Sequence, residues 1–268
     1  MSVPQPLPIR VLVKGASLTH DISERPQRRE HFIFSRVIEE SLLSSGHGAN
    51  VWTAAVASQP TAHIFRTWEE QVKAWSPDVI VLNAGYYEPV HLFLPRWLER
   101  HANSLRTRPG PVRGLYRHYL LRPVWKSLAR LQRQLDRRVK GRFFGRTVRR
   151  CGADIRAYID RSRGVGQPLI LVFEFLGPGA RGRDWFPGMA DRVEMMNAML
   201  RDLVASYDDP EIVLVRIPDI VERRLEPGVE PNTDGFHYTA RVHQYIGEEI
   251  ADEIRAWAKQ HPRLAPRD

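Results

Sequence analysis

The sequence contains very little cysteine and no long apolar run. Cys151 is the only cysteine among 268 residues, and no Cys/His group has the spacing of metal ligands. A disulfide scaffold and a structural zinc site are therefore disfavoured. No stretch approaches the roughly 18 apolar residues of a membrane span, and Met1 to Arg10 lacks a long apolar signal core. These absences predict a globular protein of the cytoplasm.

Positive charge is concentrated in one segment of the chain. The sequence carries 40 Lys and Arg residues against 31 Asp and Glu residues, a formal net charge of +9. The segment from Arg96 to Arg150 holds 17 basic and 2 acidic residues, a balance of +15, while the remainder sums to −6. The basic character therefore belongs to this segment and not to the whole fold.

Short apolar runs alternate with helical patterns along the chain. A helical spacing joins Phe34, Val37, Ile38 and Leu42, and a second one joins Val193 to Leu203. The apolar runs are Ile9 to Val13, Asn50 to Val56, Val79 to Leu82, Leu169 to Phe173 and Ile212 to Val215. This alternation predicts one domain over residues 1–268, a three-layer α/β/α fold with a five-stranded parallel sheet of the flavodoxin-like type. In such sheets the chemistry lies at the carboxyl ends of the strands.

The connection between the third and fourth predicted strands is longer than one crossover helix requires. Residues 91–163 are therefore predicted to form an inserted basic helical lid or subdomain. Within it, Val124, Leu128, Leu131, Leu135 and Val139 follow helical spacing, and arginines occupy the other faces. The apolar stripe can pack on the core, or it can remain exposed and enter a membrane interface.

Two sites carry residues that suit nucleophilic catalysis. Ser17 follows the first predicted strand, where backbone N–H groups can stabilise an oxyanion; capping of a helix is the alternative interpretation. Near the end of the chain, Asp234 stands three residues before His237, so that the carboxylate can hold the imidazole Nδ1–H and leave Nε2 free. A helix-capping Asp beside an incidental His is the alternative for this pair.

Taken together, these motifs resemble the SGNH (GDSL-type) hydrolases, most of which are esterases and lipases. The resemblance extends over segments 75–82 and 196–200 and over the terminal block His237-Tyr238-Thr239 with His243. It implies that Ser17 is the nucleophile, His237 the general base and Asp234 its orienting acid. Ala16 stands where the family usually has Asp.

The resemblance also indicates the oxyanion hole. In the second family block, Ser58 is the best match for the residue that supplies a backbone N–H. The third block, normally Gly-x-Asn-Asp, begins here at Gly85, so the asparagine donor is replaced and either Tyr87 or Asn83 must substitute for it. Glu88 and His91 are the candidate substrate-binding residues.

The sequence thus predicts a serine ester hydrolase that forms an acyl-enzyme on Ser17 and needs no metal or organic cofactor. Acyl transfer on the same site is one alternative. Another is a scaffold that has lost activity and binds an anionic partner through its basic segment. The expected partners are a small-molecule or lipid ester and, through Arg96 to Arg150, an anionic membrane surface to which the protein would be peripheral. No nucleic-acid-binding module is recognisable, which disfavours nucleic acid.

Overall fold

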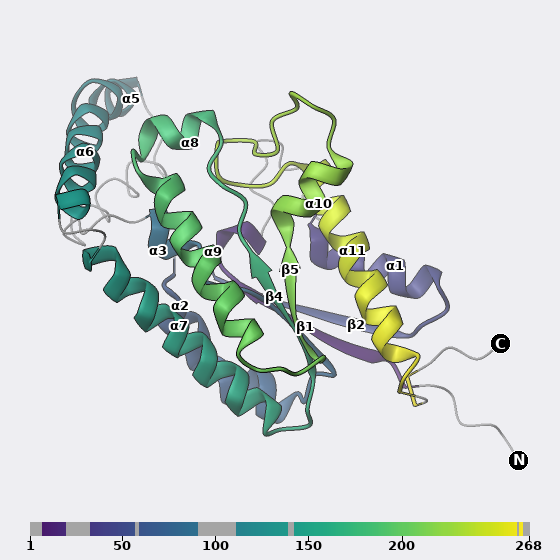
Figure 1. Cartoon of the computed structure of the whole chain (residues 1–268). Coiled ribbons are helices and arrows are strands. Elements are labelled where there is room, and N and C mark those ends of the chain that lie inside the picture. Colours follow the sequence, from purple (N-terminus) through teal and green to yellow (C-terminus); the bar gives the residue numbers. More distant parts are fainter. Residues whose placement is uncertain are drawn as a thin grey trace, which may run out of the picture.

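The computed structural model describes residues 7–19, 33–56, 59–90, 111–138, 142–261 and 263–264 (Figure 1). Its centre is a sheet of five parallel strands in the order β2-β1-β3-β4-β5. The strands are β1 (Ile9–Gly15), β2 (Ala49–Ala55), β3 (Val79–Asn83), β4 (Leu169–Glu174) and β5 (Ile212–Arg216). The predicted α/β/α fold and its five strands are therefore confirmed.

Strand order explains the apolar runs in the sequence. Every residue of β3 and β4 is buried, because helices cover both faces of a parallel sheet. The edge strands β2 and β5 keep several half-buried positions, and the apolar run of β2 is correspondingly weaker. The chain moves from β1 outward to β2 and then returns past β1 to β3. The carboxyl ends of β1 and β3 thus form the switch point at which ligands bind in folds of this kind.

Two helical layers enclose the sheet (Figure 1). Helices α1 (Phe34–Ser44) and α11 (Ala240–Ala258) pack together on one face, and α7 (Arg142–Arg163) and α9 (Met189–Ala205) pack together on the other. Shorter elements follow the strands: η1 (Ser17–Thr19), α2 (Thr61–Ile64), η3 (Phe65–Thr67), the π-helix η4 (Glu69–Ala74), α3 (Tyr87–Val90), α8 (Ala180–Trp185) and α10 (Ile217–Arg224).

Within the predicted insertion, residues 91–163, the structure describes residues 111–138 and 142–163, and these form two structurally different parts. Its last helix, α7, places Cys151, Ile155 and Ile159 in the hydrophobic core, so α7 acts as the crossover helix that leads into β4. Helices α5 (Pro111–Tyr116), η5 (Arg117–Leu121) and α6 (Arg122–Arg138) lie beside α8, away from the sheet (Figure 1). In the part of the chain that the structure describes, no helix is both long and apolar enough to cross a membrane.

Candidate active site

Ser17 lies in a tight turn directly after β1. The turn is a short 3-10 helix, Ser17–Thr19, closed by a hydrogen bond from the Thr19 N–H to the Ala16 carbonyl at 3.0 Å. A Cβ at Gly15 would overlap the Thr19 hydroxyl and lie 2.8 Å from the carbonyl oxygen of Asn83. Glycine is therefore required for the turn to fold back on β3, and this packing fixes the half-buried Ser17 at the switch point.

The end of β3 contacts the same turn. Asn83 is the partner of Gly15 in the β1–β3 register, and its buried side-chain amide donates to Thr19 Oγ1 at 3.4 Å. Gly85, two residues on, has a φ of 114°, which a residue with a side chain rarely adopts. The third sequence block thus turns sharply just after β3.

Asp234 and His237 form a hydrogen-bonded pair. Asp234 Oδ2 lies 2.8 Å from His237 Nδ1, and Oδ1 accepts the backbone N–H groups of Phe236 and His237 at 3.0 and 2.9 Å. Burial would raise the pKa of Asp234, but the hydrogen bond and charge of His237 and the two backbone donors outweigh it and lower the pKa to about 2. An ionised carboxylate on Nδ1 fixes the ring tautomer in which Nε2 can accept a proton.

The helix-capping interpretation of Asp234 is wrong. The residue that caps α11 is Thr239, whose Oγ1 accepts the Val242 N–H at 3.3 Å. Asp234 lies further upstream, and its carboxylate accepts hydrogen bonds from the imidazole and from backbone N–H groups of its own loop. The loop is closed by a hydrogen bond from the Thr233 N–H to the His237 carbonyl at 2.8 Å, so its geometry is set independently of the helix.

The loop that carries this pair lies at the carboxyl edge of the sheet. The Gly179 N–H donates to the Gly235 carbonyl at 3.0 Å, and Asn232 Nδ2 donates to the Gly177 carbonyl at 3.3 Å. Gly177 and Gly179 belong to the segment that follows β4. Because the sheet is parallel, this is the edge at which β1 ends at Gly15 and β3 ends at Asn83. Residues more than 200 positions apart in the sequence therefore share one edge of the sheet.

His243, in the first turn of α11, has a structural role. Its Nδ1 accepts the Phe34 N–H at 3.3 Å, which satisfies the start of α1, and its ring stacks on Phe34 with centroids 5.8 Å apart. Burial, assisted by the nearby His237, lowers the pKa of His243 to about 3. His243 is therefore neutral and joins α1 to α11 beneath the loop of His237.

Tyr86 is a residue of this site that sequence reasoning missed. It is buried, its ring lies 5.4 Å from that of Phe175, and its hydroxyl has no hydrogen-bond partner among the described residues. Burial, followed by the charges of Tyr238 and Asp234, raises the pKa of Tyr86 far above its usual value, so the phenol stays protonated. Its position directly after Gly85, in the third block, was the available signal.

The other predicted site residues are distributed as follows. Tyr87 is the half-buried first residue of α3, and Oε1 of the next residue, Glu88, accepts the Thr61 N–H at 2.7 Å. This contact holds the start of α2 against α3. Ser58 and His91 lie outside the described residues. The oxyanion and substrate-binding roles assigned to these residues and to Gly85 and Asn83 stay predictions.

Two further reactive side chains near this edge are engaged structurally. The Cys151 thiol is buried 3.2 Å from Thr61 Oγ1, and burial, followed by the charge of Glu88, raises its pKa. The carboxylate of Glu174, at the end of β4, is buried between Arg201 and Arg216. Within the described residues, no group of three His, Cys, Asp or Glu side chains is placed to hold a metal ion.

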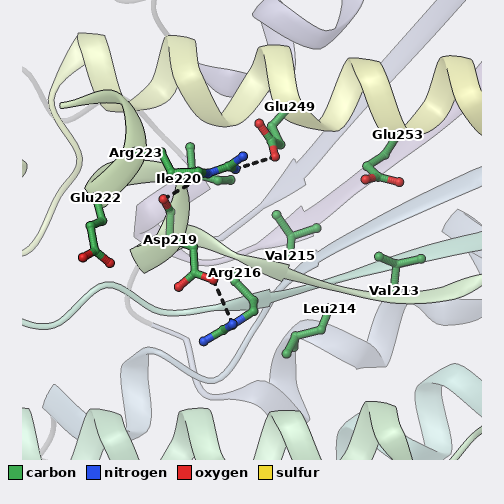
Figure 2. Close-up of a pocket in the computed structure, with 10 residues that line it drawn as sticks. All are labelled: Val213, Leu214, Val215, Arg216, Asp219, Ile220, Glu222, Arg223, Glu249 and Glu253. Atoms are coloured by element: carbon green, nitrogen blue, oxygen red, sulfur yellow. Dashed lines mark hydrogen bonds and ion pairs between the residues drawn. The ribbon is translucent and has the colours of Figure 1, made fainter.

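A separate cavity of about 600 Å³ lies along the edge strand β5, between α10 and α11 (Figure 2). Arg216 pairs there with Asp219 at 2.8 Å, and Arg223 pairs with Glu249 at 2.7 Å. Glu222 and Glu253 also line the cavity, so its lining is acidic overall, and none of the predicted catalytic residues belongs to it. The chemistry therefore points to the Ser17 and His237 edge and not to this cavity.

No protein-family model matches the sequence, and no curated protein matches it either. Solved structures do match. A lipase/acylhydrolase from Enterococcus faecalis has a TM-score of 0.58 at 13% identity, over 97% of this chain and 99% of that one. A putative lipolytic protein of the G-D-S-L family from Desulfitobacterium hafniense has a TM-score of 0.54 at 9% identity, over 90% and 97%.

A third similar structure is a catalytic mutant of Axe2, an acetylxylan esterase from Geobacillus stearothermophilus. Its TM-score is 0.55 at 13% identity, over 93% of this chain and 96% of that one. All three similarities cover nearly the full length of both chains, so they concern the whole architecture and not a shared fragment. The chain therefore has the α/β/α fold of the SGNH (GDSL-type) hydrolases.

Proposed function

We propose that this protein is a serine ester hydrolase of the SGNH type. The observation that carries the proposal is the 2.8 Å hydrogen bond from His237 Nδ1 to Asp234 Oδ2, in a loop at the sheet edge where Ser17 follows β1. An imidazole oriented by an ionised carboxylate, at the same edge as a serine in a tight turn, is the arrangement that activates a hydroxyl nucleophile. The similar structures described as lipases, acylhydrolases and esterases support the same chemistry.

The reaction would proceed by double displacement. Ser17 Oγ attacks the acyl carbon while His237 Nε2 takes its proton, and the backbone N–H groups of Ser17 and Ser58 receive the negative charge that develops on the carbonyl oxygen. Protonated His237 then donates the proton to the departing alcohol, which leaves an ester on Ser17. Water, deprotonated by His237, attacks that ester and releases the acid, and Ser17 recovers its proton.

Tyr86 would assist as a positioning residue. Its hydroxyl is buried, has no hydrogen-bond partner among the described residues and does not ionise at physiological pH. The dipole of this neutral hydroxyl can favour the ionised carboxylate of Asp234 without competing for the proton on His237. The Tyr86→Phe variant should therefore change the acidic limb of the activity profile more than it changes substrate binding.

The test is covalent labelling with a fluorophosphonate, followed by turnover of p-nitrophenyl esters and acetylated sugars. Labelling at Ser17, and its loss in Ser17→Ala but not in the exposed control Ser44→Ala, are the expected results. Transfer of the acyl group to an added alcohol or amine, in preference to water, would identify a transferase. Failure of the folded protein to label would favour a scaffold that only binds its partner.

A further inference from the structure

An unusual share of the exposed apolar side chains lies on one appendage. We call residues 111–138, which form α5, η5 and α6, the arm (Figure 1). Among the described residues, twelve large hydrophobic side chains are exposed, and eight of them belong to the arm. These eight are Val112, Leu115, Tyr116, Tyr119, Leu120, Val124, Leu131 and Leu135. Such a concentration on a surface marks an interaction site.

The inner face of α6 is fixed to the body of the protein. Trp125 is buried, with its ring edge-on to Phe186 at 5.8 Å. On the same side, Lys126 and Arg122 form ion pairs with Asp184 at 2.6 and 3.1 Å. A helix held by an aromatic anchor and by ion pairs cannot rotate to bury a different face, so these contacts determine which side chains point outward.

The apolar stripe of α6 therefore faces solvent. Val124, Leu131 and Leu135 recur at steps of seven and four residues, which places them on one side of a helix, and their exposed fractions are 47, 51 and 44%. Of the two arrangements that the sequence leaves open for this stripe, packing on the core or exposure, the structure shows exposure, because α6 meets the body of the protein through a different side.

Free positive charge accompanies the exposed stripe. Arg130 and Arg138 are exposed and, among the described residues, neither has an ion-pair partner. Over residues 111–138 the sequence contains eight basic residues and one acidic residue, Asp136. An outward surface that combines aliphatic side chains, two tyrosines and unpaired arginines matches the layered chemistry of a bilayer surface, with phosphates outside and acyl chains beneath.

We propose that the outward face of the arm docks on an anionic lipid bilayer. The stripe of Val124, Leu131 and Leu135 enters the boundary between head groups and acyl chains, and Arg130 and Arg138 lie against lipid phosphates. Nucleic acid is the less suitable partner, because exposed leucine and valine side chains find no apolar surface along a phosphate backbone. The docking does not depend on the ester chemistry.

The arm is linked to the loop of the candidate dyad through Phe186. Phe186, which receives Trp125, lies 5.3 Å from Phe236 in an edge-on contact, and Phe236 directly precedes His237. If the outer face of α6 docks on the bilayer, its inner face thus keeps its contact with Phe186, next to the proposed active site. A membrane-resident ester would then be delivered next to His237.

Vesicle co-sedimentation tests the proposal with the full-length protein. Vesicles of neutral phosphatidylcholine are compared with vesicles containing about one-third anionic phosphatidylglycerol. We expect binding to the anionic vesicles that weakens steeply as NaCl rises from about 0.05 to 0.5 M. Ser17→Ala should bind as the wild type does, which separates this proposal from the proposed hydrolase activity.

Four variants separate the two parts of the surface. Leu131→Asp with Leu135→Asp should weaken binding at least about tenfold. Leu7→Asp with Leu43→Asp, at two leucines that are more exposed, should leave it nearly unchanged. Arg130→Ser with Arg138→Ser should weaken vesicle binding about thirtyfold at low salt. The control variant, Arg36→Ser with Arg255→Ser, should have little effect on binding. Circular dichroism and thermal midpoints verify that each variant is folded.

Several results would overturn the proposal. They are equal binding to neutral and anionic vesicles, no binding to either, wild-type binding by both arm variants, and retention on duplex DNA without retention on vesicles. Loss of binding in the control variants to the same degree would also overturn it, because binding would then follow net charge or total exposed apolar area and not the arm.

Discussion

The side-chain amide of Asn83 donates to the hydroxyl of Thr19 across 3.4 Å and joins the end of β3 to the turn that begins at Ser17. An amide that already has an acceptor within the fold is less free to stabilise a transient oxyanion. Asn83 therefore has a structural role in this turn, and Tyr87, the first residue of α3, is the oxyanion donor that we test first.

Tyr87→Phe should therefore lower kcat about 10²-fold with little change in KM, as removal of a single oxyanion donor does. Asn83→Ala should lower kcat by less, about tenfold or under, because it only loosens the turn at Ser17. Steady-state kinetics on a p-nitrophenyl ester measure both effects. Wild-type rates in both variants would mean that backbone N–H groups alone form the oxyanion hole.

Asp234 should make the protein acid-sensitive. Its pKa is lowered to about 2, below that of an unfolded chain, so its stabilising effect is complete above about pH 4 and disappears as the pH falls to about 2. Asp234→Asn should lower the free energy of unfolding at pH 7 by about 2 kcal/mol and flatten this acidic limb.

Urea denaturation at a series of pH values measures the effect of Asp234. The matched control is Asp191→Asn, because Asp191 is 63% exposed and its nearest cation, Arg133, lies 3.6 Å away. That variant should retain the acidic limb of the wild type. An Asp234→Asn profile parallel to the wild type between pH 2 and about 4 would contradict the assignment.

Lys14 on β1 should also make stability rise with pH, but in an alkaline window. Its side chain is almost completely buried, with Nζ 2.7 Å from Thr67 Oγ1, and burial, opposed in part by Glu70, lowers its pKa to about 8. The unfolded chain binds more protons between that value and about 10.4, so Lys14 makes the folded state more stable as the pH rises through this window.

Lys14→Met should accordingly raise stability at pH 7, by about 2 kcal/mol, and remove the rise in stability between pH 8 and about 10. Thr67 and Gln71 remain satisfied in this variant, because they hydrogen-bond to each other at 2.8 Å. Guanidinium denaturation at pH 7 and at about pH 10 provides the measurement, with the exposed Lys73→Met as control. A less stable Lys14→Met at pH 7 would show that the amine is a net stabilising group.

The contact between α1 and α11 depends on Gly247. A Cβ there would overlap the Val37 side chain and lie 2.8 Å from the Phe34 carbonyl oxygen. Gly247→Ala should therefore destabilise the fold by about 1–3 kcal/mol. Gly114→Ala in α5, where nothing lies within 4 Å, should be neutral or slightly stabilising. Thermal unfolding of the two variants measures the difference, and equal midpoints would argue against close packing at this site.

The sequence by itself determined the sheet and the dyad pairing. Continuous apolar runs such as Val79 to Leu82 mark strands buried on both faces, and this signal is local, so it is readable without the fold. The Asp234 and His237 pair was also readable, because three residues of separation suffice to bring a carboxylate to an imidazole. Only the backbone conformation showed that Thr239, and not Asp234, caps α11.

Only the tertiary structure determined which residues that are distant in the sequence lie side by side. The contact between Asn83 and Thr19 joins residues 64 positions apart, and the packing of Tyr86 against Phe175 joins the segments that follow β3 and β4. Helix α6 illustrates the physical reason. Its sequence carries an aliphatic stripe and also Trp125 on another side, and either side could be buried. Contact with Phe186 selected Trp125 and left the stripe in solvent, because a helix buries the face for which the rest of the protein supplies a partner.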